Sequence, residues 1–162
     1  MSSAPPPFQA FLDEHREAVW RFLVASVGRT DADDCFQETF IAALRAYPQL
    51  RSRRREHNLR AWVLTIAHRK ALDAHRARAR RATPVADPLA VSDPAAPAAD
   101  GRDEELWEAV DGLPERQRSA VVLRFVGDLA HREIATAIGC SEESARASLH
   151  EGLSKLRKVV PA

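Results

Sequence analysis

Three polar side chains able to bind a charged partner lie close together in the stretch DCFQETFIAALRAY, residues 34–47. Asp34 and Glu38 supply carboxylates and Gln37 supplies an amide, with aromatic and aliphatic residues between them. Carboxylates form charge-assisted hydrogen bonds with basic groups, so this set could dock on a basic partner surface. The alternative is a helix N-terminus, where the helix dipole favours acids such as Asp31 and Asp34.

The sequence contains no catalytic or metal-binding set. Its six His residues are scattered, and it has neither a Ser, His and Asp arrangement nor a Gly-rich phosphate loop. Cys35 and Cys140 lack a second thiol or a His at metal-ligand spacing, and their apolar surroundings predict that both are buried. We therefore expect no enzyme activity, no cofactor and no metal.

Basic residues are concentrated in one block, although the net charge is only +1. Residues 51–81 carry eleven Arg and Lys against two acids, whereas residues 82–115 carry nine acids against one Arg. A dense basic block is typical of proteins that bind a polyanion, and a solvated helix face is the alternative.

Helices must position these residues, because every clear periodicity in the chain is helical. In the segment that contains the acids, the expected buried stripe is Phe36, Phe40 and Leu44. Helical spacing then places five residues together on a different face. They are Asp34, Gln37, Glu38, Ile41 and Arg45.

Residues 82–100 divide the chain, because this segment has seven Ala, four Pro and three Asp without a sustained period. We expect an all-α fold of two small helical domains, residues 8–81 and 102–160, joined by a flexible Ala/Pro linker, residues 82–101. No run approaches the roughly 20 apolar residues of a membrane span, and the N-terminus lacks a signal-peptide pattern. The expected location is the cytoplasm, without membrane insertion.

The segment LAHREIATAIGCSEESARASLHEGLSKLRK, residues 129–158, predicts a helix-turn-helix. Gly139 is placed to turn the chain, Ser141 to cap the second helix, and Ala135 to let the two helices cross closely. A plain helical hairpin in a bundle is the alternative. The residues expected inside are Ile138, Ala145, Leu149, Leu153 and Leu156.

Three motifs, in order, resemble the extracytoplasmic-function (ECF) sigma factors of bacterial RNA polymerase over nearly the whole chain. DADDCFQETFIAALRAY resembles the polymerase-binding helix, and LRAWVLTIAHRKALDAHRARARR resembles the helix that melts and reads the minus-10 element. LPERQRSAVVLRFVGDLAHREIATAIGCSEESARASLHEGLSKLRK resembles the minus-35 helix-turn-helix. The resemblance implies a transcription initiation factor that binds core polymerase and directs it to specific promoters.

The resemblance also implies partners. The face with Asp34, Gln37, Glu38, Ile41 and Arg45 matches the one that family members press against the clamp helices of the largest polymerase subunit. The second domain is expected at the flap of the second-largest subunit and on promoter DNA. Whether an anti-sigma factor binds the chain stays open.

The residues expected at the minus-10 element come from the basic block and the helix after it. Trp62 could stack on an unpaired base or anchor the core. Arg69 replaces an Asn that is common in the family and His68 replaces a common Arg, so the minus-10 sequence is not carried over. The expected contacts are Arg53, Arg54, Arg55, Arg60, Trp62, Thr65, His68, Arg69 and Arg76.

The residues expected at the minus-35 element depart further from the family pattern. The second helix begins SEESARASLHEG, where Glu142 and Glu143 would be repelled by phosphate unless they accept from cytosine or serve the helix dipole. We expect weak DNA binding by this domain alone. The expected contacts are Arg132, Ser141, Ser144, Arg146, His150 and Lys155.

Two other classes of protein remain open at the level of sequence. A helix-turn-helix repressor would share the second module, but it would bind duplex DNA without polymerase and would not need the DCFQETF segment. An enzyme is the other class. Gel shifts with and without core polymerase distinguish these classes.

Overall fold

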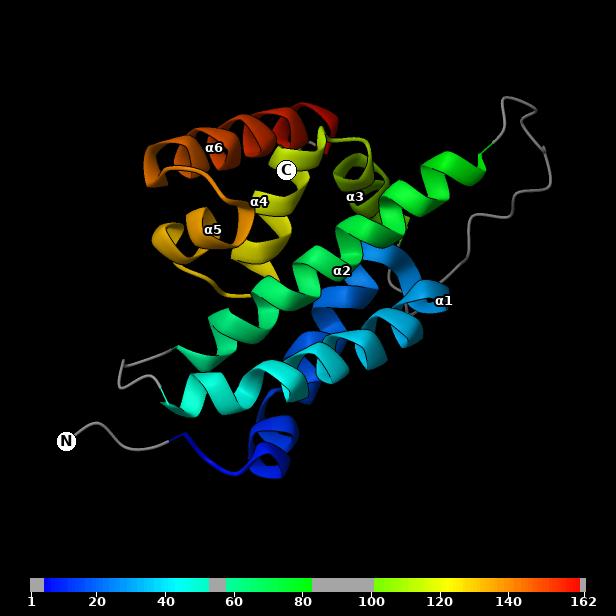
Figure 1. Ribbon diagram of the computed structural model, residues 1–162. Helices are drawn as coiled ribbons and strands as arrows, with labels where there is room; N and C mark the ends of the chain where they lie inside the picture. The colour runs from blue at the N-terminus through cyan, green and yellow to red at the C-terminus, as the bar shows by residue number, and fades with distance from the viewer. Residues whose placement is uncertain (1–4, 53–57, 83–100, 161–162) are drawn as a thin grey trace. The chain divides into compact units, whose positions relative to one another are not determined.

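The computed structural model describes residues 5–52, 58–82 and 101–160, and every regular element in these ranges is a helix (Figure 1). The predicted all-α fold is confirmed. The chain divides into two compact units, Met1–Ala86 (unit 1) and Asp87–Ala162 (unit 2). None of the described helices is long and apolar enough to span a membrane. The helices are α1 (Phe8–Ser52), α2 (Leu59–Arg81), α3 (Gly101–Asp111), α4 (Glu115–Phe125), α5 (His131–Ile138) and α6 (Glu142–Val159).

In unit 1, α1 is a hairpin of two helical arms that meet at Gly28. Gly28 has φ 81° and ψ 165°, a conformation that glycine adopts easily because it has no Cβ. The arms before and after Gly28 run antiparallel. Trp20 therefore meets Phe36, with 5.9 Å between ring centroids, and Phe8 meets Tyr47 at 5.3 Å. The two arms and α2 form the three helical layers of unit 1 (Figure 1).

Aromatic side chains join these layers into one core. Phe11, on the first arm, is fully buried, and its ring centroid lies 5.2 Å from Tyr47, 6.4 Å from Phe40 and 5.7 Å from Trp62 of α2. Burying such a side chain contributes about 1.5–3 kcal/mol. Other side chains exposed by 2% or less in this core are Val19, Phe22, Leu23, Ala32, Thr39, Ala43, Val63, Leu64, Ala67 and Ala71.

The buried stripe of the second arm differs from the predicted one. Phe40 is buried and Phe36 is half-buried, but Leu44 is 53% exposed, so the prediction that Leu44 lies in the core is wrong. Ala43 and Tyr47 are buried in its place. This arm packs against both the first arm and α2, so its buried face is centred about one residue earlier than the sequence pattern predicts.

Unit 2 contains the predicted helix-turn-helix in α5 and α6. Gly139 ends α5 in the left-handed conformation, with φ 80° and ψ 42°. The Ser141 hydroxyl accepts a hydrogen bond from the Ser144 backbone N–H at 3.1 Å, as a helix N-cap does. Leu129, just before α5, and Ile134, on the inner face of α5, are fully buried. Both the turn at residue 139 and the cap at residue 141 are thereby confirmed.

The packing inside unit 2 was only partly foreseen. Ala145, Leu149 and Leu156 are buried as expected, whereas Ile138 and Leu153 are half-buried. Gly152 is buried, and a Cβ there would lie 3.0 Å from Val121 Cγ2. α4 and α6 therefore approach closely at this glycine, which no sequence motif had marked.

The two cysteines differ in burial. Cys35 is 4% exposed, which confirms one prediction, whereas Cys140 is only half-buried, so the prediction that it is buried is wrong. Cys140 follows the αL residue that ends α5, and its thiol faces the turn, where it donates to the Ser141 carbonyl at 3.4 Å.

Candidate functional site

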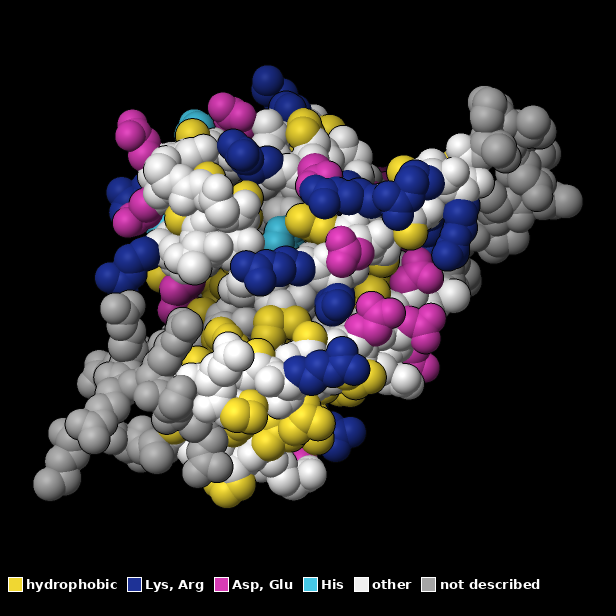
Figure 2. Space-filling view, viewed as in Figure 1, with side chains coloured by type: hydrophobic (Ala, Val, Ile, Leu, Met, Phe, Trp, Pro, Cys, Tyr) yellow, Lys and Arg dark blue, Asp and Glu magenta, His cyan; other side chains and the backbone are white. Residues whose placement is uncertain are grey.

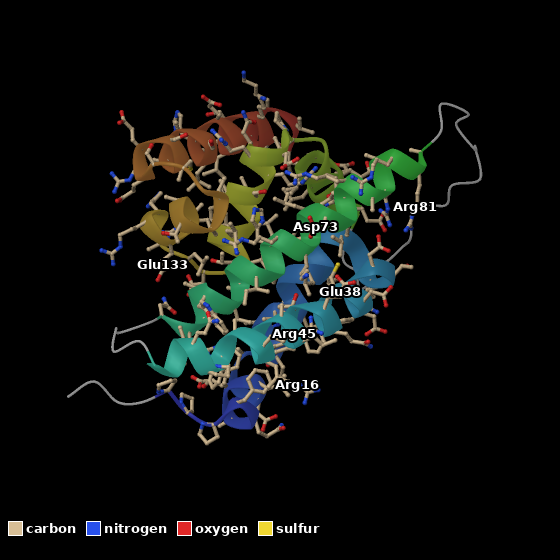
Figure 3. All side chains as sticks on the ribbon, in the orientation of Figure 1. Arg16, Glu38, Arg45, Asp73, Arg81 and Glu133 are labelled. Atoms are coloured by element: carbon tan, nitrogen blue, oxygen red, sulfur yellow. The ribbon has the colours of Figure 1, made fainter. Side chains whose placement is uncertain are left out.

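The second arm of α1 presents the five predicted partner-binding residues on one exposed face, which we call the arm surface. Figure 3 labels Glu38 and Arg45 along this arm. The prediction that these residues share an exposed face is confirmed. The exposed residues are Asp34, Gln37, Glu38, Ile41 and Arg45.

The arm surface also has an apolar part. Ile41 is 50% exposed and Leu44 is 53% exposed, one turn apart on the helix. Hydrophobic side chains reach the molecular surface over α1 in Figure 2. Large apolar side chains beside polar ones are typical of surfaces that bind another protein. The sequence offered one signal that Leu44 is exposed, because Leu44 lies three residues after Ile41 and so close to the partner-binding face. The same position also fits the core stripe that had been assumed.

The arm surface lies in a negatively charged environment. Burial raises the pKa of the Cys35 thiol to about 11, and the nearby carboxylates of Glu38, Asp31, Asp34 and Asp73 add to the increase. The thiol is therefore protonated near neutral pH and is a poor nucleophile. The same carboxylates would attract a basic partner.

The exposed face of α2 is basic. Asn58 starts the helix by accepting a hydrogen bond from the Ala61 N–H at 3.2 Å. Arg69 and Arg76 are exposed as predicted, and Lys and Arg side chains gather over the C-terminal half of α2 in Figure 2. The last turn adds Arg78, Arg80 and Arg81. This face can attract phosphate groups. The predicted contacts Arg53, Arg54 and Arg55 lie outside the described residues.

Other predicted minus-10 residues are partly or fully withdrawn from the surface. Arg60, Trp62 and Thr65 are half-buried, and the Thr65 hydroxyl donates to the Ala61 carbonyl at 2.8 Å. The Trp62 ring contacts Phe11 and Tyr47, which favours the core-anchor interpretation of Trp62.

His68 is only 4% exposed. A side chain with so little accessible surface is not available to DNA in this conformation, and we correct its assignment as a DNA contact. His68 lies between Ala67 and Ala71, both buried, on the α2 face that packs against α1.

An ion pair that the sequence did not indicate joins α1 and α2. Arg78 Nη2 lies 2.7 Å from Asp31 Oδ2. Asp31 had been considered only for its effect on the helix dipole. Because these side chains are 62% and 37% exposed, the pair contributes at most about 0.2–1 kcal/mol to stability.

In unit 2 the predicted minus-35 residues divide into two groups. Arg132, Arg146, His150 and Lys155 are exposed and available to DNA. Ser141 is also exposed, but its hydroxyl caps α6, and the Ser144 N–H is the donor of that cap. The cap explains the presence of Ser141 without any contact with DNA, whereas Ser144 contributes only its backbone N–H to the cap.

One of the acids on α6 is paired. Arg146 Nη2 lies 2.7 Å from Glu142 Oε1, one helical turn away. The expectation that Glu142 repels phosphate, accepts from cytosine or serves the helix dipole therefore omitted its direct bond to Arg146. The i, i+4 spacing and opposite charges were the available sequence signal.

The fold and surfaces define a two-unit helical protein with a basic helix and a helix-turn-helix. The chain matches Sigma-70 region 2 over residues 11–81 and Sigma-70, region 4 over residues 103–156. It is 31% identical to the ECF RNA polymerase sigma factor SigD of Mycobacterium tuberculosis, over 93% of this chain and 76% of that protein. It is 27% identical to the ECF RNA polymerase sigma factor SigX of Bacillus subtilis, over 93% of this chain and 82% of that protein. The chain therefore belongs to the ECF sigma factors, which are promoter-specific transcription initiation factors.

Solved structures agree on the fold. The sigma factor RpoE from Bartonella quintana, in complex with the anti-sigma factor NepR, has a TM-score of 0.77 at 20% identity, covering 94% of this chain and 95% of that one. CnrH, in complex with the cytosolic domain of CnrY, has a TM-score of 0.63 at 20% identity, covering 93% and 85%.

Proposed function

We propose that this sigma factor divides promoter recognition between its two helical domains, residues 8–81 and 102–160. The first domain binds core RNA polymerase through the arm surface and contacts the melted minus-10 element through α2 and through Arg53, Arg54 and Arg55. The second reads the minus-35 element with α6 and contacts the polymerase flap. Nucleotide chemistry belongs to the polymerase, so the chain itself needs no catalytic group or cofactor.

The arm surface is the observation that carries this proposal. Five residues predicted from the motif share one exposed helical face, while Cys35 and Thr39 are buried on the other side of the helix. The Thr39 hydroxyl donates to the Cys35 carbonyl at 2.6 Å, so this buried hydroxyl has a hydrogen-bond partner within the same helix. A rigid face with acids, an amide and two exposed aliphatic side chains fits the basic and apolar surface of a partner helix. The clamp helices of the largest subunit are the proposed partner.

Replacing Gln37 and Glu38 together by Ala tests this assignment. Co-purification with core polymerase should be lost, while the far-UV helical signal stays unchanged because both residues are exposed. The matched control replaces Gln9 and Glu17, which are exposed on the first arm, by Ala. The control should bind normally. If the Gln37 and Glu38 variant binds polymerase as well as the control does, the arm surface is not the docking site.

An anti-sigma factor is a second proposed partner. The two solved structures described above are complexes, one with NepR and one with the cytosolic domain of CnrY. An inhibitor that covered the arm surface would compete with polymerase for Gln37 and Glu38. The proposed place of action is the cytoplasm, where core polymerase and promoters are found.

A further inference from the structure

The start of α6 has a defined geometry. The Ser141 cap fixes the first turn, and Glu142 and Arg146 follow on one exposed ridge with an Nη2 to Oε1 distance of 2.7 Å. The Glu142 side chain is 44% exposed and that of Arg146 is 62% exposed. Both groups therefore remain accessible to a ligand while they are bonded to each other.

The helix beneath the pair is held firmly. Ala145 and Leu149, on the neighbouring face of α6, are buried, which fixes the rotation of the helix and the direction of the ridge. Ala147, beside Arg146, is exposed and short, so it leaves space for another surface to approach. In helix-turn-helix proteins, residues near the N-terminus of the second helix contact base edges in the major groove.

The chemistry of the pair fits a G·C base pair. A guanidinium has five N–H donors, so Arg146 can keep its bond to Glu142 and still direct donors at guanine O6 and N7. A free Arg side chain loses rotamer freedom when it binds a base, whereas one already held by a neighbour has less freedom to lose.

We propose that Glu142 is a positioning residue for base recognition, which holds Arg146 so that α6 selects a G·C pair within the minus-35 element. This inference rests on the proposed function of unit 2. It assigns a cooperative role to an acid for which phosphate repulsion, a bond from cytosine or the helix dipole were the expected roles.

Removal of the Glu142 carboxylate should raise the affinity for DNA of any sequence and lower the selectivity for the G·C pair. Loss of a negative charge near the phosphates raises binding to all sequences, because one repulsive interaction disappears. Loss of the Arg146 support lowers the preference for one base pair. Simple charge repulsion by Glu142 predicts only the first change.

The experiment uses holoenzyme assembled from the full-length chain and core RNA polymerase, with a duplex library randomised through the minus-35 region. Sequencing of the bound DNA gives the base preference of each variant. Arg146→Ala should lower the preference at one G·C position by about fivefold to about 100-fold, the value of one bidentate pair. Glu142→Ala should lower it at the same position by at least about twofold, and the double variant should match Arg146→Ala. Glu142→Gln, which keeps an acceptor oxygen, should fall between Glu142→Ala and the parent.

Glu143→Ala is the matched control, because it removes the same charge from the same helical turn while Arg146 keeps its bond to Glu142. It should raise binding to all sequences and leave the preference unchanged. The inference is overturned if Glu142→Ala behaves like Glu143→Ala, or if Arg146→Ala leaves an existing preference intact. A parent holoenzyme without any preference in this region would instead overturn the proposed function of unit 2, and the inference with it.

Discussion

At the scale of single residues, His15 makes the stability of the unit 1 core depend on pH. The imidazole is 8% exposed and its ring centroid lies 5.0 Å from that of Phe11. Burial lowers the pKa of His15 below its ordinary value of 6.5; Glu14 acts to raise this pKa and Arg60 to lower it further. The net lowering shows that desolvation outweighs the attraction of Glu14, whose carboxylate is 3.9 Å away and well exposed.

This lowered pKa predicts that unit 1 loses stability in mild acid. Below pH 6.5 the unfolded chain takes up a proton at His15 before the folded chain does, so the free energy of unfolding falls until the folded pKa is passed. The slope contributed by one group is at most about 1.4 kcal/mol per pH unit. Urea unfolding of a Trp107→Phe chain, followed by the fluorescence of Trp20 and Trp62, measures unit 1 separately.

Two variants complete this test. His15→Gln should remove most of the slope below pH 6.5, because an amide does not titrate. His150→Gln should keep the slope, since His150 is exposed on unit 2. If His15→Gln and the parent lose stability equally as the pH falls, another group is responsible.

At the scale of elements, the contact between α4 and α6 depends on Gly152, which has no side chain. A Cβ at Gly152 would lie 3.0 Å from Val121 Cγ2 and 3.4 Å from the Gln117 carbonyl oxygen. Beside this contact, Gln117 Nε2 donates to Glu151 Oε2 at 2.9 Å. The two helices are therefore spaced for glycine, and α6 is held in register by a hydrogen bond to α4.

Gly152→Val should destabilise unit 2 by about 1–3 kcal/mol, because the added methyl groups must displace α4 or α6. Thermal or urea unfolding of a Trp20→Phe, Trp62→Phe chain, followed by Trp107 fluorescence, measures the change in unit 2. Ala147→Val is the matched control on the exposed side of α6, and it should cost only the small helix propensity of a β-branched residue, about 0.6 kcal/mol. Equal losses in the two variants would mean that the α4 contact is not tightly packed.

At the scale of the whole molecule, the two units differ in their capacity to bind DNA. The exposed face of α2 is strongly basic, whereas the start of α6 carries Glu142 and Glu143 beside Arg146. One of these acids already occupies a donor of Arg146. We therefore expect unit 2 to make few phosphate contacts and its DNA binding to depend on its connection to unit 1.

Cutting that connection should abolish minus-35 selection. A protease site placed between residues 83 and 100 allows cleavage after holoenzyme has assembled. The apparent affinity of unit 2 for upstream DNA should fall by about 100-fold or more, since tethering raises the effective concentration of a weak module. Footprinting of the minus-35 region before and after cleavage measures the loss. The control is holoenzyme whose sigma chain lacks the protease site, treated with the same protease. A footprint that survives cleavage would indicate that the linker is not what holds unit 2 at the minus-35 element, and that the polymerase flap or tight DNA binding by unit 2 itself does so.

The sequence alone determined the features that depend on neighbouring residues. Helical periodicity gave the all-α class, because a repeat of 3.6 residues needs no information from distant parts of the chain. The turn at Gly139 and the cap at Ser141 are likewise local, since each satisfies backbone groups within a few residues. The polar face with Gln37 and Glu38 followed from spacing on one helix, and the order of the motifs indicated the family.

The tertiary structure decided which helical faces meet. Leu44 is exposed and His68 is buried because packing against two neighbours sets the rotation of each helix, which a single-helix pattern leaves undetermined. The Asp31 to Arg78 ion pair joins residues 47 positions apart. The close approach at Gly152 depends on the separation of α4 and α6. These features arise from distances between elements, and such distances are fixed only when the core packs.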